Sequence, residues 1–372
     1  RQLCADDELR CRLGANALVR ARDFGWDRMV DRYEELYRSV IDRKQPAEAT
    51  RYRWRGVFRP RCLSEKRIYA FDDSADWGRK VVRAARQQGL AATLFKKASQ
   101  VPDHEDVVTF LRMRNSPRWL DHNRDLARQL AEKQNILMIP APHECELYDN
   151  KILQSKMFSE WLPKTHYATS QAEAMTLLET VQFPLVSKSS EGSASSNVRL
   201  LHSAADAEDE IARVWSAAGM PRYHGLSQQG YVLWQDFLPG NAYDLRVDVV
   251  AWRYLYVVKR YNRDGVPFAS GGGRAEAVED LTPELEELLT YSLAFAKAQR
   301  LSLVALDVIR DREGRFTVIE ASCGWGQKAG SSRFFESHNG RWRAMDFRAA
   351  DLFDIVVKAI KQGAFDDKSC LS

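Results

Sequence analysis

Residues 303–322 read LVALDVIRDREGRFTVIEAS, which is two apolar runs joined by the turn DREG. Each run has the length and apolar content of one strand, so the stretch predicts two adjacent strands. Each strand carries one carboxylate, Asp307 in the first and Glu320 in the second. A carboxylate inside an apolar strand is costly unless it is paired or bound to a metal. We therefore expect both to bind a metal ion; in the alternative, an arginine such as Arg310 caps each of them.

Two lysines upstream are the second informative feature. Lys151 lies in LYDNKILQSK, and Lys188 ends the apolar run FPLVSK. Ammonium groups bind phosphate oxygens as point charges, and carboxylates hold Mg²⁺. Two lysines followed by two carboxylates are what a site for a Mg²⁺-bound polyphosphate needs, so we expect ATP and Mg²⁺ as cofactors. The alternative for Lys188 is an ordinary turn with a lysine that extends to solvent.

The composition limits the class of protein. The chain has 372 residues, 45% of them apolar, which is enough for about two or three compact domains. Because it has no apolar run that could span a bilayer and no apolar leader, we expect a soluble protein without a transmembrane segment. Six cysteines without a CxxC pair predict reduced thiols in a cytoplasmic protein. A net charge of +4 is too small to predict a nucleic-acid partner, and a first residue that is not Met suggests a longer parent polypeptide.

The pattern of apolar residues predicts five segments. Residues 1–43 carry apolar residues at three- and four-residue steps, which is typical of helices that dock on a partner surface. Residues 44–66 predict a linker in which solvated arginines alternate with aromatic residues; an anion-binding strip is the alternative. Residues 67–145 alternate strands with helices, which predicts a small parallel sheet. Residues 146–230 mix strands with helices, and residues 231–372 contain consecutive strands that predict a mostly antiparallel sheet.

One cluster of potential ligands precedes Lys151. It consists of His143, Glu144, Cys145 and Glu146, whose spacing does not match a metal site. We expect a loop here that leads into Lys151.

The order of the segments resembles the ATP-grasp superfamily, and within it the branch of the ribosomal-protein glutamate ligases. The resemblance extends over about residues 67–335. Several motifs in the right order carry it: IPAPHECELYDNK, PLVSKSSEGSASSNV, VLWQDFLPGNAYDLRV, SGGGRAE, ALDVIR and VIEAS.

This resemblance implies a fold of the α/β (α+β) class. A small parallel α/β domain, residues 67–145, is followed by two α+β subdomains that grip ATP. These are residues 146–230 and residues 231–372, and the second holds the metal.

The resemblance also assigns nucleotide contacts. Lys188 stands beside a turn whose hydroxyl and backbone N–H groups can bind phosphate, with Ser193 among them. The extended segment QDFLPG is implied to bind adenine, and Asp244 to bind the ribose. The adenine residues are Gln235, Asp236, Phe237 and Leu238.

Arginines are expected to supply the catalytic charge. Arg246 faces the same way as Asp244 on the strand that follows, and a salt bridge between strands is its alternative role. The family places an arginine just after the Phe of FASGGGR, where this chain has Ala269. Arg260, Arg263 or Arg274 would then replace it, and we name Arg246, Arg260 and Arg274 as catalytic.

Three further positions depart from the family pattern. Ser322 stands where an Asn usually serves as third metal ligand, and we expect its hydroxyl or a water to complete the oxygen shell. Asp236 replaces the usual Glu. The phosphate-binding turn has one Gly and many Ser, which predicts a stiffer loop.

Residues 1–43 resemble the last helices of retaining, two-Rossmann-domain glycosyltransferases. The stretch contains none of that family's donor-binding residues, so it predicts only a fused or associated glycosyltransferase, not transferase activity.

The prediction from the sequence is an ATP-dependent carboxylate–amine ligase that forms ADP. The substrates would be small-molecule, glycan or peptide carboxylates and amines. Two alternatives remain: a kinase that phosphorylates an alcohol, and a degenerate nucleotide-binding scaffold.

Overall fold

The computed structural model divides the chain into two units, Arg1–Arg61 and Cys62–Ser372. The structure describes residues 66–73, 76–192, 198–222, 227–265, 267, 274–325, 332–338, 340–348 and 351–365. The predicted helices of residues 1–43 and nearly all of the linker therefore lie outside the described residues. All that follows concerns the second unit.

The first sheet is parallel, as predicted. Its order is β2-β1-β3-β4, and all neighbouring strands run in the same direction. Helices α4 (Trp77–Gln87) and α5 (Pro117–Ala131) connect the strands, with a short 3₁₀ turn, η1 (Ala98–Gln100), after β2. The strands are β1 (Arg67–Phe71), β2 (Ala91–Phe95), β3 (Val107–Phe110) and β4 (Leu137–Ile139).

Helix α4 shows why this domain packs closely. Its apolar face, including Val81, Val82 and Ala85, is buried, while Arg83 on its other side is exposed. Gly78 lies where the helix crosses the end of β1: a Cβ atom there would be 2.0 Å from the carbonyl oxygen of Phe71. Only glycine fits this approach without a backbone shift.

The second sheet is antiparallel, with the order β5-β10-β6-β7. It contains the predicted strands at Lys188 and Gln235 and one strand that was not predicted, β5. Helix α8, which follows β5 in the chain, was not predicted either. Its strands and helices are β5 (Thr165–Ala168), α8 (Gln171–Leu178), β6 (Leu185–Lys188), β7 (Val198–Leu201), α9 (Ala204–Val214) and β10 (Val232–Asp236). β10 thus pairs in this sheet although it falls in the predicted segment 231–372. A two-stranded ribbon of β8 (Met220–Pro221) and β9 (Ser227–Gln228) follows α9.

The third sheet has seven strands in the order β15-β14-β11-β12-β16-β17, with β13 also paired to β12. All pairs are antiparallel, as predicted, whereas β13, β16 and β17 were not predicted. The strands are β11 (Tyr243–Val250), β12 (Tyr254–Tyr261), β13 (Ala275–Val278), β14 (Leu303–Arg310), β15 (Phe316–Ser322), β16 (Arg333–His338) and β17 (Arg341–Arg348).

Four further helices border this sheet or lead to it. In α10, the Thr282 side chain accepts the N–H of Leu285 and Pro283 is the first residue, which confirms the predicted start. The helices are α6 (Pro142–Leu147), α7 (Lys151–Met157), α10 (Pro283–Ala298) and α11 (Leu352–Lys361).

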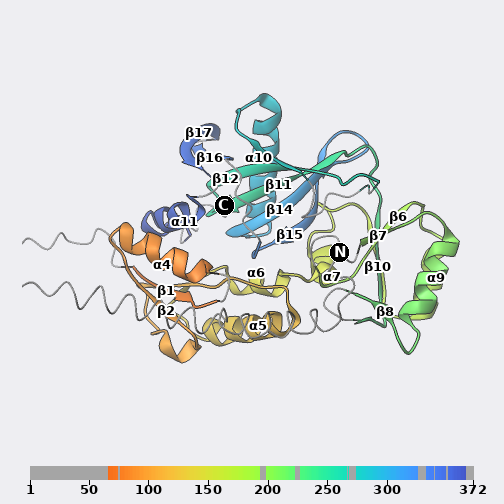
Figure 1. Cartoon of the computed structure of the whole chain (residues 1–372), viewed down its shortest axis with the longest axis horizontal. Coiled ribbons are helices and arrows are strands. Elements are labelled where there is room, and N and C mark those ends of the chain that lie inside the picture. The colour runs from red at the N-terminus through yellow and green to blue at the C-terminus, as the bar shows by residue number, and fades with distance from the viewer. Residues whose placement is uncertain are drawn as a thin grey trace, which may run out of the picture. The chain divides into compact units, whose positions relative to one another are not determined.

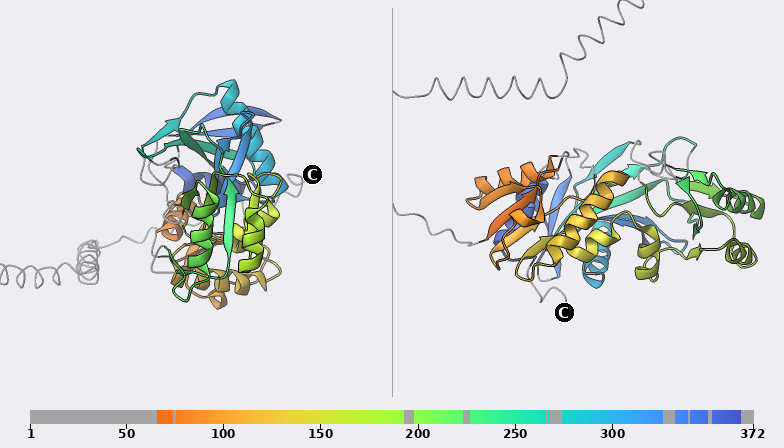
Figure 2. Two further views of the ribbon diagram at one scale, coloured as in Figure 1. Left: turned by 90° about the vertical axis from the view of Figure 1, so that its right-hand side faces the viewer. Right: turned by 90° about the horizontal axis from the view of Figure 1, so that it is seen from below.

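Strand alternation gives the third sheet two different faces. On β14, Val304, Leu306 and Val308 pack in a core with α10, while Leu303 and Ala305 belong to a core shared with the first sheet, α4 and α11. The side chain of Gln88 donates to the carbonyl of Asp354, so α4 and α11 are also tied by a hydrogen bond. Figure 1 shows these two helices side by side, and Figure 2 shows α9 far from them. The first and third sheets therefore share one hydrophobic core.

Among the residues described, no helix is both long and apolar enough to cross a bilayer.

We predict that Gly78→Ala lowers the free energy of unfolding by about 1–3 kcal/mol, because the added Cβ must displace the backbone of Phe71. Arg83→Ala, at an exposed position of the same helix, is the control and is expected to change stability by less than about 0.5 kcal/mol. Chemical denaturation of both variants measures the difference. Equal stability of Gly78→Ala and the wild type would contradict the close approach.

Candidate active site

An open cavity of about 740 Å³ lies between elements of the second and third sheets. Most of the residues predicted from the sequence line it. They are Lys151, Lys188, Gln235, Asp236, Phe237, Leu238, Asp244, Asp307 and Glu320.

Lys151 lies at the start of α7, where the Asn150 side chain caps the helix by accepting the N–H of Leu153. Its ammonium group is 3.1 Å from Glu320 Oε1 and donates to the carbonyl of Gly192 at 2.9 Å. Burial disfavours this charge, but the carboxylates of Glu320 and Asp149 outweigh burial and raise the pKa of Lys151. Lys151 is therefore a permanent cation at the cavity wall.

Lys188 has a different environment at the end of β6. Its Nζ donates to Gln235 Oε1 at 2.6 Å and has no carboxylate within hydrogen-bond distance among the described residues. Burial lowers the pKa of Lys188 to about 8, although the field of Glu320 acts in the opposite direction. Lys188 is thus a cation that a bound anion would stabilise.

Asp244 and Asp307 line the cavity and belong to a network of ion pairs with Arg246 and Arg260, which are not themselves among the lining residues. Asp307 accepts from Arg246 Nε at 2.5 Å and lies 2.7 Å from Arg260 Nη2, and Arg260 Nε also binds Asp244 at 2.6 Å. Burial opposes the charge of Asp307, but the two guanidinium groups lower its pKa. Burial raises the pKa of Asp244 to about 6, with the nearby Asp307 adding to the effect. The alternative for Arg246, a bridge between strands, is therefore present, whereas Arg310 pairs with Glu284 instead of capping either carboxylate.

The two predicted metal ligands are cross-strand partners. Asp307 on β14 is in register with Glu320 on β15, next to a bulge between Asp307 and Val308. Within the described parts of the chain, no group of three Asp, Glu, His or Cys residues is placed to hold a metal. Mg²⁺ usually takes one or two protein carboxylates and completes its shell with phosphates and water. Two carboxylates suit that mode, and Glu320, whose side chain is 32% exposed, is more accessible than Asp307.

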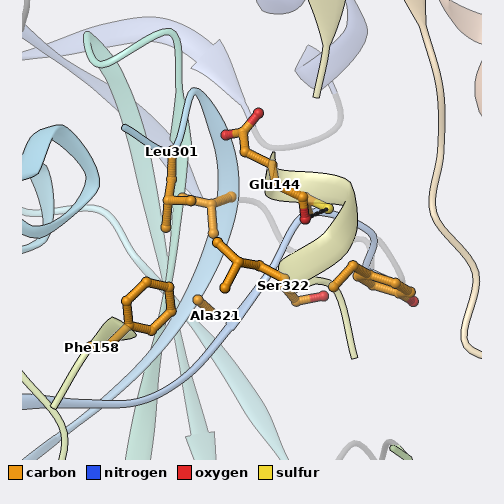
Figure 3. Close-up of a pocket in the computed structure, with 9 residues that line it drawn as sticks. Glu144, Phe158, Leu301, Ala321 and Ser322 are labelled. Atoms are coloured by element: carbon orange, nitrogen blue, oxygen red, sulfur yellow. Dashed lines mark hydrogen bonds between the residues drawn. The ribbon is translucent and has the colours of Figure 1, made fainter. Parts of the chain in front are cut away.

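Ser322 does not reach this cavity. Its hydroxyl donates to the carbonyl of Gly324 at 2.9 Å, and its side chain lines a second, small cavity with Glu144 and Phe158 (Figure 3). The prediction that Ser322 completes the metal shell is thus not supported by its position in the structure.

The remaining residues named from the sequence lie apart from this cluster or outside the described residues. Arg274 is largely exposed, pairs with Glu276 and lies over the ring of Tyr261. Arg263 is exposed as well. Ser193 and Ala269 lie outside the described residues, so their roles stay predictions.

The loop predicted around His143–Glu146 is wrong, because these residues form α6. Glu144 is buried, accepts the N–H of Leu303 at 3.2 Å and the hydroxyl of Ser302 at 2.9 Å, and so joins α6 to the start of β14. Burial raises its pKa to about 7. Pro142 as first helical residue and Glu144 two positions later are start signals that could have predicted this helix.

Asn241 was also missed. Its side chain donates to the carbonyl of Leu238 at 3.3 Å and accepts the N–H of Arg310 at 3.0 Å. It thereby fixes the turn after β10 to the end of β14. An Asn that follows the Pro-Gly pair of a turn is a recognisable signal for this role.

A family model of the RimK-like ATP-grasp domain matches residues 150–333, which include both lysines and both carboxylates. The chain carries a RimK-like ATP-grasp domain.

Solved structures of ATP-grasp proteins have a similar fold. D-cycloserine synthetase DcsG matches with a TM-score of 0.53 and 14% identity, over 80% of this chain and 99% of that one. The ATP-grasp ligase PsnB complexed with minimal precursor matches with a TM-score of 0.52 and 15% identity, over 79% and 99%. PsnB complexed with minimal precursor, Mg and ADP matches with a TM-score of 0.51 and 14% identity, over 81% and 98%.

These matches confirm the predicted ATP-grasp fold, and at such identities they establish the fold alone. No curated protein sequence matches the chain. The glycosyltransferase resemblance of residues 1–43 is tested by none of these findings and stays a prediction.

We predict that Glu320→Gln removes Mg²⁺-dependent ATP turnover, whereas Ser322→Ala retains most of it. The first change removes an accessible negative charge from the cavity, and the second removes a hydroxyl that points elsewhere. Turnover assays over a range of Mg²⁺ concentrations compare the two variants. Greater damage from Ser322→Ala would show that Ser322 serves the metal after all.

We also predict that ATP affinity decreases as the pH rises through about 8, the pKa of Lys188. A base with a lowered pKa loses its positive charge at lower pH than usual, and the attraction for phosphate is lost with it. Lys188→Arg, which stays charged, should show no such decrease between about pH 7 and pH 9.5. Titration calorimetry with ATP measures both curves, and the same pH dependence in both proteins would exclude Lys188 as the cause.

Proposed function

We propose that the protein is an ATP-dependent ligase that activates a carboxylate as an acyl phosphate and transfers the acyl group to an amine. The observation that carries the proposal is the convergence in one cavity of two lysines, Lys151 and Lys188, and two carboxylates, Asp307 and Glu320. The RimK-like family match and the ATP-grasp fold support it.

The cavity has an apolar part that suits the adenine of ATP and a charged part that suits its phosphates. Apolar side chains, among them Val186, Ile309 and Ile319, line part of the wall and suit the adenine ring. The segment from Gln235 to Leu238 borders the same space, with Asp244 nearby for the ribose. Lys151 and Lys188 would bind the phosphate oxygens as point charges.

Charge neutralisation is the main task in phosphoryl transfer, because the protein needs no nucleophile of its own. Mg²⁺, held by Glu320 with Asp307 as second carboxylate, would neutralise the phosphate oxygens. Arg246 and Arg260 are fixed by their bonds to Asp307 and are oriented before any substrate binds. In this proposal they stabilise the charge that develops on the transferred phosphoryl group and on the acyl phosphate. Arg274 would contribute only after leaving Glu276.

The proposed substrate class is broad. PsnB was solved with a minimal precursor, and DcsG is named as a D-cycloserine synthetase, so proteins with a similar fold differ widely in their substrates. We propose a small-molecule, glycan or peptide carboxylate and an amine, released as an amide with ADP and phosphate. Because this reaction consumes ATP, a cytoplasmic location suits it, as do the free thiols of Cys145 and Cys323. A glycosyltransferase fused to or associated with residues 1–43 remains part of the proposal.

One observation favours the scaffold alternative. Both oxygens of Asp307 are engaged by arginines, and Ser322 lies outside the cavity, so the site has few free metal ligands among the described residues. A protein of this kind would bind ATP without turning it over.

We predict that purified protein with Mg²⁺ and ATP releases ADP, not AMP, when a panel of amino acids, sugar acids and peptides is supplied. Hydroxylamine should trap the acyl phosphate as a hydroxamate, which mass spectrometry detects, and Glu320→Gln is the negative control. A phosphorylated alcohol without hydroxamate would indicate a kinase. ATP binding without any turnover would indicate the scaffold.

A further inference from the structure

Asp149 occupies a costly position next to the site. It precedes the cap of α7 and has a φ of 51°, in the left-handed region that non-glycine residues rarely adopt. Its carboxylate is buried, with the residue 5% exposed. Asp149 lies within the motif IPAPHECELYDNK, but neither the sequence analysis nor the proposed mechanism assigns it a role.

The carboxylate of Asp149 joins two parts of the site. Its Oδ1 accepts the N–H of Gly192 at 2.8 Å and lies 3.6 Å from Lys151 Nζ. Lys151 in turn donates its Nζ to the carbonyl of Gly192 and its backbone N–H to Ser190 at 3.0 Å. The turn after β6, residues 189–192, is therefore fastened to the start of α7 with Asp149 at the centre of the contacts.

The second oxygen of Asp149 has no hydrogen-bond partner among the described residues, although it is buried. An unpartnered buried carboxylate oxygen and a left-handed backbone each cost free energy. A neutral acceptor such as Asn would cap the Gly192 N–H equally well and would tolerate this backbone. Fold stability thus does not explain why a charge stands here.

The charge of Asp149 matters because two carboxylates share the ammonium group of Lys151. Its ammonium lies between Glu320, at 3.1 Å, and Asp149, at 3.6 Å. If Glu320 held a metal–nucleotide complex, as the proposed function requires, Lys151 would lose the nearer carboxylate, although its side chain is only 11% exposed. Asp149 is the carboxylate that remains.

We propose that Asp149 is a positioning residue that holds Lys151 against the phosphate-binding turn and balances its charge when Glu320 is engaged elsewhere. The inference rests on the proposed function, since it requires that Lys151 binds the phosphates of ATP.

The test is Asp149→Asn, which keeps the acceptor for Gly192 and the left-handed backbone but removes the charge. We expect the affinity for Mg²⁺-ATP to fall about tenfold, the effect of one weakened charge-assisted contact. The affinity for adenosine, which has no phosphates, should not change. The melting temperature should stay the same or rise, because a buried carboxylate with one unpartnered oxygen is replaced by a neutral amide.

Two further variants control the experiment. Asp76→Asn removes a charge at another left-handed, exposed residue and should leave ATP affinity unchanged. In a Lys151→Met background, Asp149→Asn should cause no additional loss of ATP affinity, because Asp149 acts through Lys151.

The outcomes separate the inference from the proposed function. If the wild type does not bind ATP, the proposed function is wrong. If the wild type binds ATP and Asp149→Asn binds it equally well, the role of Asp149 is wrong. Equal losses for ATP and adenosine together with a lower melting temperature would show a merely structural residue, and that result would also overturn the inference.

Discussion

The candidate site depends on the pairing of the buried Asp307 carboxylate with Arg246 and Arg260. Leaving one member of a buried ion pair without its partner costs on the order of 3–5 kcal/mol. The three residues stand on three adjacent strands, β14, β11 and β12, so their pairing fixes the register of the sheet where apolar packing ends. Because Arg260 also binds Asp244, the network extends along the cavity wall. The charged residues are thus ordered in advance, which is what electrostatic catalysis requires.

One face of the third sheet serves both the core and the cavity. Along β14, Leu303 and Ala305 pack against the first sheet, and Asp307, two residues further, lines the cavity. Along β11 the same face runs from Val250 in the core through Asp248 and Arg246 to Asp244, which lines the cavity. The parallel domain covers the apolar part of this face and leaves the charged part open. Its position therefore decides where the site begins.

The features with a local signal could be predicted from the sequence. The hairpin of Asp307 and Glu320 was predicted because its alternation and turn lie within twenty residues. Lys188 was predicted because it ends an apolar strand. β16 was missed because its buried Glu336 is satisfied by Arg253 and Arg343, of which Arg253 is far away in the sequence. The position of Ser322 could not be predicted, because its hydroxyl bonds to Gly324, where a Cβ would lie 2.3 Å from the carbonyl of Met113 in another domain. Such contacts between distant segments leave no pattern in a single sequence. The role of Ser322 as a metal ligand stays a prediction.

The separation of the hydrophobic cores has a mechanical consequence. The second sheet, with α8 and α9, packs around its own core, which includes Leu185, Ile211 and Trp234, whereas the first and third sheets share theirs. Rotation of the second sheet as a rigid body about its connections exposes little apolar surface, but separation of the other two sheets would expose a large amount. The first and third sheets, which carry Asp307 and Glu320, therefore form one packed body, and the second sheet, which carries Lys188, forms another.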